Sequence, residues 1–217
     1  VDLYRKKTDP LVAAITTPSS IGVKSVMMNM GQLKTDGIEV TLKVSPIYRP
    51  QDRFVWNISL NGTHAKSKYS KIGNRLQSMN EQNQANLNTT RYYDGGSPTD
   101  IWAVRSAGID PATGQDLFIK KDGTYTFTYD KNDEVVVGNT EPKLEGVLGT
   151  TLYYKGLSFG CYLRYRLGGQ VFNNALYEKV ENIDREGINY NQDKRALYDR
   201  WSTPGQEAKF KRISLFQ

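Results

Sequence analysis

Apolar and polar residues alternate with a period of two in several long stretches of the chain. The clearest case has an aliphatic residue at every second position from Ile38 to Val44, with polar residues or glycine between them. Such alternation predicts β-strands with one apolar face and one polar face. Strands are predicted near 1–8, 36–46, 53–61, 147–154 and 157–167. The fold class is therefore predicted to be all-β, with antiparallel up-and-down strands.

The predicted strands are long. The segments 36–46, 53–61 and 157–167 match the roughly 9–11 residues of a tilted transmembrane β-strand, whereas soluble strands usually have about 5–6. An apolar row facing lipid and a polar row facing a wet interior would describe a barrel wall. A soluble β-sandwich has the same alternation, with its apolar row facing a core. Periodicity alone leaves both interpretations open.

The predicted connections differ in length at the two ends of the strands. The segment 47–52 and the pair Lys155-Gly156 are short, whereas the loop regions 9–35, 62–146 and 168–217 are long. Short turns at one end and long loops at the other are typical of outer-membrane barrels. The aromatic residues nearest the short turns suggest an interfacial girdle, although aromatic residues are favoured in strands generally. These residues are Tyr48, Phe54, Tyr153 and Tyr154.

The long loop regions contain signals of their own. Asp122-Gly123 lies between the strand-like runs 117–121 and 124–129, which predicts a β-hairpin. Residues 70–91 are rich in Asn, Gln and Ser and predict a polar loop or a short helix. The stretch 182–200 has a helical pattern of charges.

Composition supports β-structure with many turns. The chain has 217 residues, a net charge of +6, 19 Gly and 14 Tyr, and 11% of its residues are aromatic. These values exclude collagen, a coiled coil and acidic disorder. No apolar run is long enough for a transmembrane helix, and the first residues lack the apolar core of a signal peptide.

Basic residues are scattered rather than gathered into one patch. The densest groups are Arg5-Lys6-Lys7, Lys66-Ser67-Lys68 and 209–212. A nucleic-acid surface would combine clustered Lys and Arg with interleaved aromatic residues. We therefore expect no nucleic-acid partner and interpret these groups as solvated strand ends and loops.

Candidate chemistry is sparse. One cysteine, Cys161, and one histidine, His64, exclude an internal disulfide and a Cys-based zinc site. The segments 110–116 and 130–134 resemble calcium loops but lack the EF-hand spacing, and such residues are common turn formers. Loop carboxylates could form the acid pair of a glycoside hydrolase, but nothing in the sequence pairs them. We predict no catalytic residue, no metal and no cofactor, so the chain is not expected to be an enzyme.

One loop segment is a candidate for contact with a substrate or partner. It combines aromatic faces, acids and glycines, which suit contact with a sugar or a peptide. The alternative is that its aromatic residues anchor the loop. The candidate residues are Tyr92, Tyr93, Asp94, Asp100 and Trp102.

Seven segments in order resemble one family. The run NMGQLKTDGIEVTL at 29–42 resembles the "N-x-G-x-x-x-N-x-G-I-E" pattern of TonB-dependent receptors, although Asp36 replaces the usual Asn or Arg. Six later segments are similar to the SusC/RagA subgroup: GIDPATGQD at 108–116, VGNTEPK at 137–143, YKGLSF at 154–159, YRLGGQ at 165–170, DKRAL at 193–197 and RWSTPG at 200–205. The resemblance covers nearly the whole chain.

The resemblance implies part of a 22-stranded transmembrane β-barrel in the outer membrane of a Gram-negative bacterium. Members of this family import glycans, peptides or similar large nutrients. They work with a SusD-like surface lipoprotein and receive energy through TonB. The chain would be a late section of the barrel that is cut at both ends, and TonB would act through an N-terminal part outside it. The alternative from another class is a secreted β-sandwich that binds glycans through its loops.

In a barrel wall, alternate residues have different surroundings. The residues predicted to face lipid are Ile38, Val40, Leu42, Phe54, Trp56, Ile58, Phe159, Leu163 and Tyr165. The residues predicted to face the lumen are Glu39, Lys43, Asn57, Arg164 and Arg166. The loops 62–146 and 168–217 would meet the lipoprotein and the oligosaccharide or peptide cargo.

Overall fold

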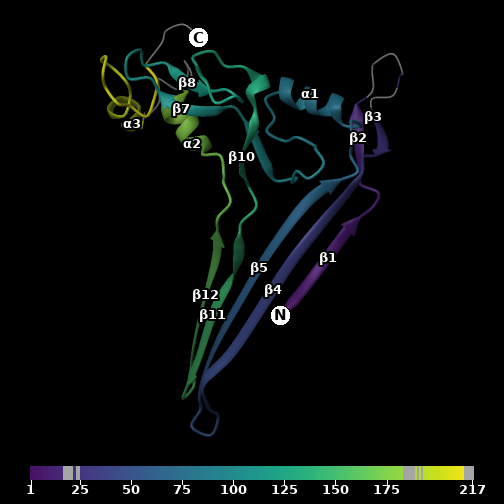
Figure 1. Cartoon of the computed structure of the whole chain (residues 1–217). Coiled ribbons are helices and arrows are strands. Elements are labelled where there is room, and N and C mark those ends of the chain that lie inside the picture. The colour runs from purple at the N-terminus through teal and green to yellow at the C-terminus, as the bar shows by residue number, and fades with distance from the viewer. Residues whose placement is uncertain (17–21, 23–24, 183–188, 190, 192, 213–217) are drawn as a thin grey trace. The chain divides into compact units, whose positions relative to one another are not determined.

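The computed structural model describes residues 1–16, 22, 25–182, 189, 191 and 193–212 (Figure 1). The chain divides into two compact units. The first comprises Val1–Ile101 and Gly138–Gln170, and the second comprises Trp102–Val137 and Val171–Gln217. Within the described residues, no helix has the length and apolar character needed to cross a membrane.

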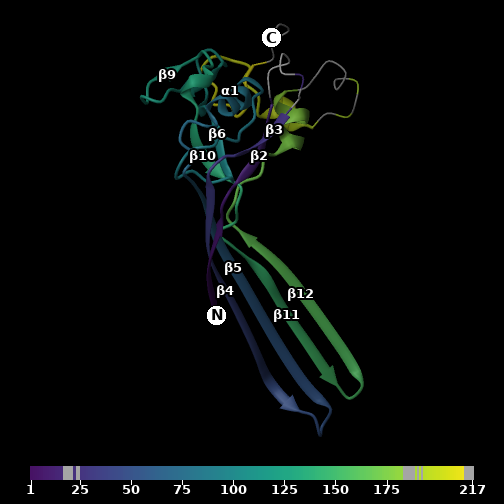
Figure 2. The same cartoon turned by 90° about the vertical axis from the view of Figure 1, so that its right-hand side faces the viewer.

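The first unit is built on a five-stranded sheet in which every neighbouring pair is antiparallel. The strand order is β1-β4-β5-β11-β12, and the long strands are visible in Figure 2. The all-β antiparallel class predicted from the sequence is confirmed for the described residues. The strands are β1 (Asp2–Thr8), β4 (Gln32–Arg49), β5 (Phe54–Ser70), β11 (Leu144–Tyr154) and β12 (Leu157–Leu167).

The two short turns of this sheet lie at the same end, after β4 and after β11 (Figures 1 and 2). The second turn consists of Lys155 and Gly156, whose φ angles are 47° and 100°. Positive φ at both positions is the requirement of the tight turn that best matches strand twist. The remaining connections leave from the opposite end, so the expected asymmetry of turns and loops is present.

The strand β4 runs three residues beyond the predicted end at Pro46. Its register with β5 shifts between Val44 and Ile47, so Ser45 and Pro46 together lie opposite Asn57. Proline has no N–H to donate to a ladder and is tolerated in strands mainly at bulges. The prediction ended the strand at the proline, whereas the bulge accommodates it and the ladder continues to Arg49.

Three strands also extend into segments predicted as loops. Residues 32–35 belong to β4, 62–70 belong to β5, and 144–146 belong to β11. The alternation of apolar and polar residues stops there, but the ladder continues, with Thr35 Oγ1 and Ser67 Oγ 2.8 Å apart. The predicted boundaries at these ends are wrong because apolar alternation reports the environment of a strand rather than its hydrogen bonding.

A small apolar cluster covers one face of the extended part of β4 and β5. Met30, Tyr69, Ile72 and Leu76 are buried together, and Leu33 packs against them. The cluster includes the loop before the helix α1 (Gln77–Ala85), which lies in the segment predicted as a polar loop or short helix. The long 9–35 connection contains a two-stranded ribbon of β2 (Val12–Thr16) and β3 (Ser25–Asn29).

The division between the units falls within two paired strands, β6 (Asp100–Ala103) and β10 (Val135–Asn139). The second unit contains a three-stranded sheet with the order β7-β8-β9. Its strands β8 and β9 form the predicted hairpin, in which Gly123 has a φ of 89°. The elements are β7 (Arg105–Ile109), β8 (Asp116–Ile119), β9 (Tyr125–Thr126) and the 3-10 turn η2 (Lys131–Asp133).

The last described part of the second unit has a small core of Val180, Ala196 and Phe210. The buried Arg200 guanidinium donates to the carbonyl oxygens of Val180, Ala196 and Lys211 and so joins three segments. The helix predicted at 182–200 is present only as α3 (Arg195–Tyr198); residues 183–188, 190 and 192 lie outside the described residues. The other elements are α2 (Asn174–Leu176) and the π-helical turn η3 (Tyr177–Glu181).

The close approach of β5 and β11 requires glycine at position 146. A Cβ atom there would overlap the carbonyl oxygen of Asn61 and lie 2.6 Å from the Tyr165 hydroxyl. We predict that Gly146→Ala lowers the free energy of unfolding by about 1–3 kcal/mol, as overpacking does. Urea denaturation of the protein that carries this chain, followed by tryptophan fluorescence, measures the change.

Gly160→Ala is the matched control. Its Cβ would meet no atom closer than 3.7 Å, so we expect a much smaller change. Equal losses in the two variants would contradict the steric explanation, because a Cβ atom at Gly160 has room and one at Gly146 does not.

Candidate functional site

The register of the five-stranded sheet determines which residues share a face. Leu42 lies opposite Leu60, Leu60 lies opposite Leu148, and Leu148 lies opposite Leu163. Directly opposed residues project to the same side of a sheet. All nine residues predicted to face lipid therefore lie on this side, which we call the apolar face. They are Ile38, Val40, Leu42, Phe54, Trp56, Ile58, Phe159, Leu163 and Tyr165.

The other side, which we call the polar face, carries all five residues predicted to face the lumen. Glu39 lies opposite Thr63, and Asn57 accepts a hydrogen bond of 2.7 Å from the Ser45 hydroxyl. Arg166 Nε lies 3.3 Å from a Glu145 carboxylate oxygen. The set is Glu39, Lys43, Asn57, Arg164 and Arg166. The geometry separates the two predicted sets, and their roles toward lipid and lumen stay predictions.

The apolar face is open to its surroundings. The side chains of Leu42, Phe159 and Leu163 are 52%, 61% and 61% exposed. Contiguous exposed apolar surface of this kind marks an interaction site with protein, ligand or membrane. Cys161 is exposed on the same face.

Aromatic residues close the turn end of the apolar face. The rings of Phe54 and Tyr154 meet edge to face, with centroids 5.3 Å apart. Of the four residues predicted for an interfacial girdle, Tyr48 and Tyr153 both lie opposite Val55 on the polar face, and a girdle stays a prediction for Phe54 and Tyr154. The bulge in β4 and the alternation of β11 place them there, and neither effect is visible in a list of aromatic positions.

Tyr165 lies near the opposite end of the apolar face, one row before Leu144 and Leu167. Its hydroxyl donates a 2.6 Å hydrogen bond to the carbonyl oxygen of Asn61. The ring lies across the neighbouring Gly62 and Gly146, where no side chains compete for the space. The sequence held a signal for this contact, a tyrosine in one strand and glycines in two others, but only the register brings them together.

Two of the loop candidates, Tyr92 and Asp94, make contacts that hold the loop in place. Tyr92 packs against Tyr69, with ring centroids 5.6 Å apart, and Asn80 binds both backbone groups of Tyr92. Asp94 accepts hydrogen bonds from the backbone N–H groups of Ile72 and Gly73. These contacts favour the anchoring interpretation for Tyr92 and Asp94.

The other loop candidates differ in their surroundings. Asp100 accepts hydrogen bonds from the Ser97 backbone N–H and the Asn139 side chain. Tyr93 is 47% exposed, and Trp102 belongs to the second unit. Contact with a substrate or partner stays a prediction for all five residues, and the exposed Tyr93 is the best placed for it.

The aspartates that resembled calcium loops form turns. Asp110 accepts hydrogen bonds from the backbone N–H and the hydroxyl of Thr113, and Asp130 accepts one from the backbone N–H of Asn132. The Thr113 hydroxyl is the main cause of a lowered pKa for Asp110. Within the described parts of the chain, no three His, Cys, Asp or Glu side chains are arranged to hold a metal ion.

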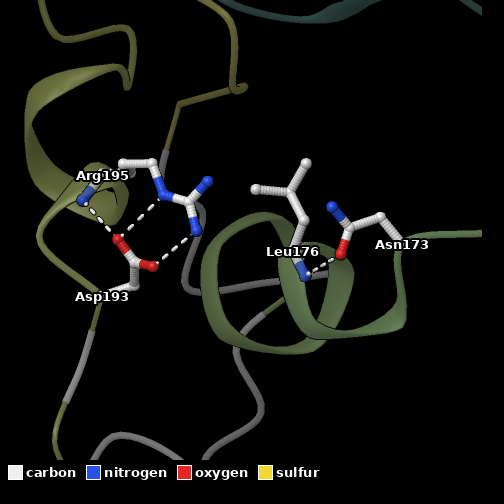
Figure 3. Close-up of polar contacts among 4 residues, drawn as sticks. All are labelled: Asn173, Leu176, Asp193 and Arg195. Carbon is white, nitrogen blue, oxygen red and sulfur yellow. Dashed lines mark hydrogen bonds and ion pairs between the residues drawn. The ribbon is translucent and has the colours of Figure 1, made fainter. Parts of the chain in front are cut away.

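Two side chains organise the last loop region (Figure 3). Asn173 Oδ1 accepts a hydrogen bond from the Leu176 backbone N–H and caps α2. Asp193 accepts bonds from the backbone N–H, Nε and Nη2 of Arg195 at the start of α3. The Arg195 guanidinium is the largest influence that lowers the pKa of Asp193, to about 2.

Comparison with known proteins finds relatives that are similar in sequence and solved structures that are similar in fold. No family model matches the chain. The chain is 26% identical over 197 residues to TonB-dependent receptor P3 of Formosa agariphila, and 26% identical over 189 residues to TonB-dependent receptor P26 of the same organism. The matches cover 82% and 80% of this chain and 19% of each relative, so the chain spans about a fifth of the length of these curated relatives.

Solved structures show the same arrangement. The RagAB peptide importer in its open-open state superposes with a TM-score of 0.74 at 22% identity, over 99% of this chain and 23% of that chain. The RagAB peptide transporter superposes with a TM-score of 0.72 at 21% identity, over 97% of this chain and 23% of that chain. The resemblance to SusC/RagA-family TonB-dependent transporters is confirmed. The similar proteins are named as receptors and transporters rather than enzymes.

Asp94 makes the loop before α1 sensitive to acid. Hydrogen bonds from the Ile72 and Gly73 backbone N–H groups lower the pKa of Asp94. A carboxyl group with a lowered pKa stabilises the folded loop above its unfolded pKa of about 3.9, and this contribution is lost as pH falls through the folded value. We predict that pepsin cleavage within 70–91 accelerates as pH is lowered from 4 to 2.

Asp94→Asn tests the cause of that acceleration. The amide retains an acceptor but cannot titrate, so cleavage should be faster at pH 4 and should depend less on pH. An unchanged pH dependence in this variant would assign the effect to another group.

Proposed function

We propose that this chain forms part of the barrel wall and the extracellular loops of a SusC/RagA-like transporter in the outer membrane of a Gram-negative bacterium. The complete protein would import glycans, peptides or similar large nutrients. Relatives named as TonB-dependent receptors and the RagAB peptide importer support this class of activity. The contribution of the chain is passive: it separates lipid from a polar conduit and presents loops at the mouth.

The exposed apolar face carries the proposal. Apolar side chains occupy it on β4, β5, β11 and β12, and the same strands place charged and polar groups on the opposite face. In a membrane the first face would meet acyl chains and the second would meet water. A soluble sandwich would need a second sheet against the apolar face, and the exposure of Phe159 and Leu163 argues against that alternative.

The edges of the sheet support a larger assembly. β1 and β12 are the outer strands of the five-stranded sheet. Open strand edges are not tolerated in lipid because their backbone groups would lack hydrogen-bond partners. Further strands would therefore pair with both edges, and transporters of this class close with about 22 strands around a plug.

The long connections suit the extracellular side. Outer-membrane barrels have short periplasmic turns and longer extracellular loops, which would place α1 and the second unit outside the cell. There they would meet a SusD-like surface lipoprotein and the cargo. TonB would act through a part of the protein beyond this chain.

The facing of β12 can be tested with two adjacent substitutions in the complete protein. Leu163→Arg puts a charge on the apolar face, which costs about 2–4 kcal/mol near the bilayer midplane. We expect a large loss of assembled protein from outer-membrane fractions. Arg164→Leu removes a charge from the polar face and should assemble close to wild-type levels. Equal tolerance of both variants would show that the assigned facing is wrong.

The location and size of the protein test the proposal as a whole. We expect an antibody against residues 70–90 to detect a heat-modifiable band in outer-membrane fractions, several times larger than the 24.6 kDa of this chain. Heat-modifiable migration reports a closed barrel that resists unfolding in detergent. A band near 24.6 kDa in the soluble fraction would contradict the proposal and favour the binding module.

A further inference from the structure

A band of basic residues lies on the apolar face directly beyond its apolar part. Two rows cross β1, β4 and β5 in register. The first row consists of Arg5, Asp36 and Lys66, and the second consists of Lys7, Lys34 and Lys68. The first basic group of the sequence, Arg5-Lys6-Lys7, thus lies in the same rows as the second, Lys66-Ser67-Lys68, with only β4 between them.

Three of these lysines make no ion pair in the described part of the chain. Arg5 pairs with Asp36 at 2.5 Å and Lys7 pairs with Asp9 at 2.9 Å. Lys34, Lys66 and Lys68 are exposed and make no ion pair within the described part of the chain. Lys34 lies directly opposite Lys68, and like charges in this position destabilise a sheet. An anion bound between them would remove that repulsion.

The lysines line two hollows of the first unit, which share His64, Lys66 and Lys68. One has a volume of about 510 Å³ and is also lined by Lys34 and Ile38. The other has a volume of about 880 Å³ and is also lined by Lys143, Ser97 and Asn139. Ammonium, imidazole, hydroxyl and amide groups are the donors that bind phosphate oxygens.

The carboxylates at these hollows have partners of their own. Asp36 binds Arg5, and Asp100 accepts from Ser97 and Asn139. Glu141 accepts from the Thr99 hydroxyl. Each carboxylate keeps its charge, but the smaller hollow is lined by Lys34, Lys66 and Lys68 against Asp36 alone, so its net charge is positive and favours an anion.

The position of the band along the strands indicates which anion. Below it on β5, the apolar face carries Phe54, Trp56, Ile58 and Leu60. At about 3.4 Å per residue and a tilt of about 40°, His64 lies about 26 Å above Phe54, which matches an apolar band about 25 Å tall. The lysines would lie just above the acyl chains, at the level of lipid headgroups.

We propose that Lys34, Lys66 and Lys68 bind the phosphate groups of lipids in the outer leaflet, while the acyl chains of these lipids lie along the apolar face. This inference rests on the proposed barrel function. A headgroup at this site bridges β4 and β5 and offsets the repulsion between Lys34 and Lys68. Because the contacts are ionic and partly exposed, binding weakens as salt increases.

The test uses the complete protein, purified in neutral detergent, and its thermal unfolding midpoint. Diphosphorylated lipid A in detergent micelles should raise the midpoint and should bind at least about tenfold more weakly to a Lys34→Gln/Lys66→Gln/Lys68→Gln variant. The matched control is Lys6→Gln/Lys43→Gln/Arg164→Gln, which removes the same charge from the polar face. It should respond to lipid A like the wild type.

The other outcomes each overturn a stated part. Equally weakened lipid A binding in both triple variants would contradict the assignment of Lys34, Lys66 and Lys68. So would an undiminished response to lipid A in the variant that lacks these three lysines. Stabilisation by inorganic phosphate at the same phosphate concentration would indicate a site for a free anion and would overturn the lipid assignment. Heat-modifiable migration is checked first on the wild-type protein and on every variant. A wild-type protein that does not show it would contradict the barrel proposal. A wild-type protein that shows it but does not bind lipid A would contradict the lipid site alone.

Discussion

The hydrogen-bonded register of β4, β5, β11 and β12 is the constraint on which the rest of the structure depends. Because side chains alternate with a period of two, a slip of one residue would exchange the apolar and polar faces of a strand. The bulge at Ser45 and Pro46 shows the effect of such a slip on the residues that follow it. One extra residue in β4 absorbs the proline and also moves Ile47 to the apolar face opposite Trp56. It also moves Tyr48 to the polar face and Arg49 to the apolar face, opposite Phe54.

The same register links packing to chemistry at both ends of the apolar face. At the turn end it joins Phe54 to Tyr154, and at the other end it brings Tyr165 over Gly62 and Gly146. Beyond the row of Leu3, Ile38 and His64 it continues without apolar residues and aligns Lys34 with Lys68. The change from apolar to charged residues lies between Ile38 and Asp36 on β4 and between Leu60 and Lys66 on β5. Such a boundary is expected where a membrane core ends and its charged headgroup layer begins.

The sequence predicted which residues share a face of this sheet better than it predicted where the strands begin and end. The alternation placed the predicted residues of each set together on one face of the sheet. It does so because an apolar environment on one side selects the same pattern, whether that environment is lipid or a protein core. It missed the ends of β4 and β5, where Thr35 and Ser67 pair through hydroxyl groups and no apolar residue signals the ladder. It also grouped Tyr48 and Tyr153 with Phe54, because distance from a turn does not reveal the face of a residue. The basic rows depended on contacts between β1, β4 and β5, and nothing local specifies them.

The loop candidates show a related limit. Aromatic and acidic residues in 92–102 suggested contact with cargo, yet Tyr92 fills an apolar cluster and Asp94 accepts two backbone hydrogen bonds. A loop that presents groups to a ligand must first satisfy its own backbone, and the same residue types serve both needs. Composition therefore identifies the loop but not its contact residues. Exposure distinguishes the two tyrosines: Tyr92 is half-buried, whereas Tyr93 is 47% exposed. Specificity for cargo would consequently depend on few residues from each loop, with the anchors providing the rigidity that holds them in place.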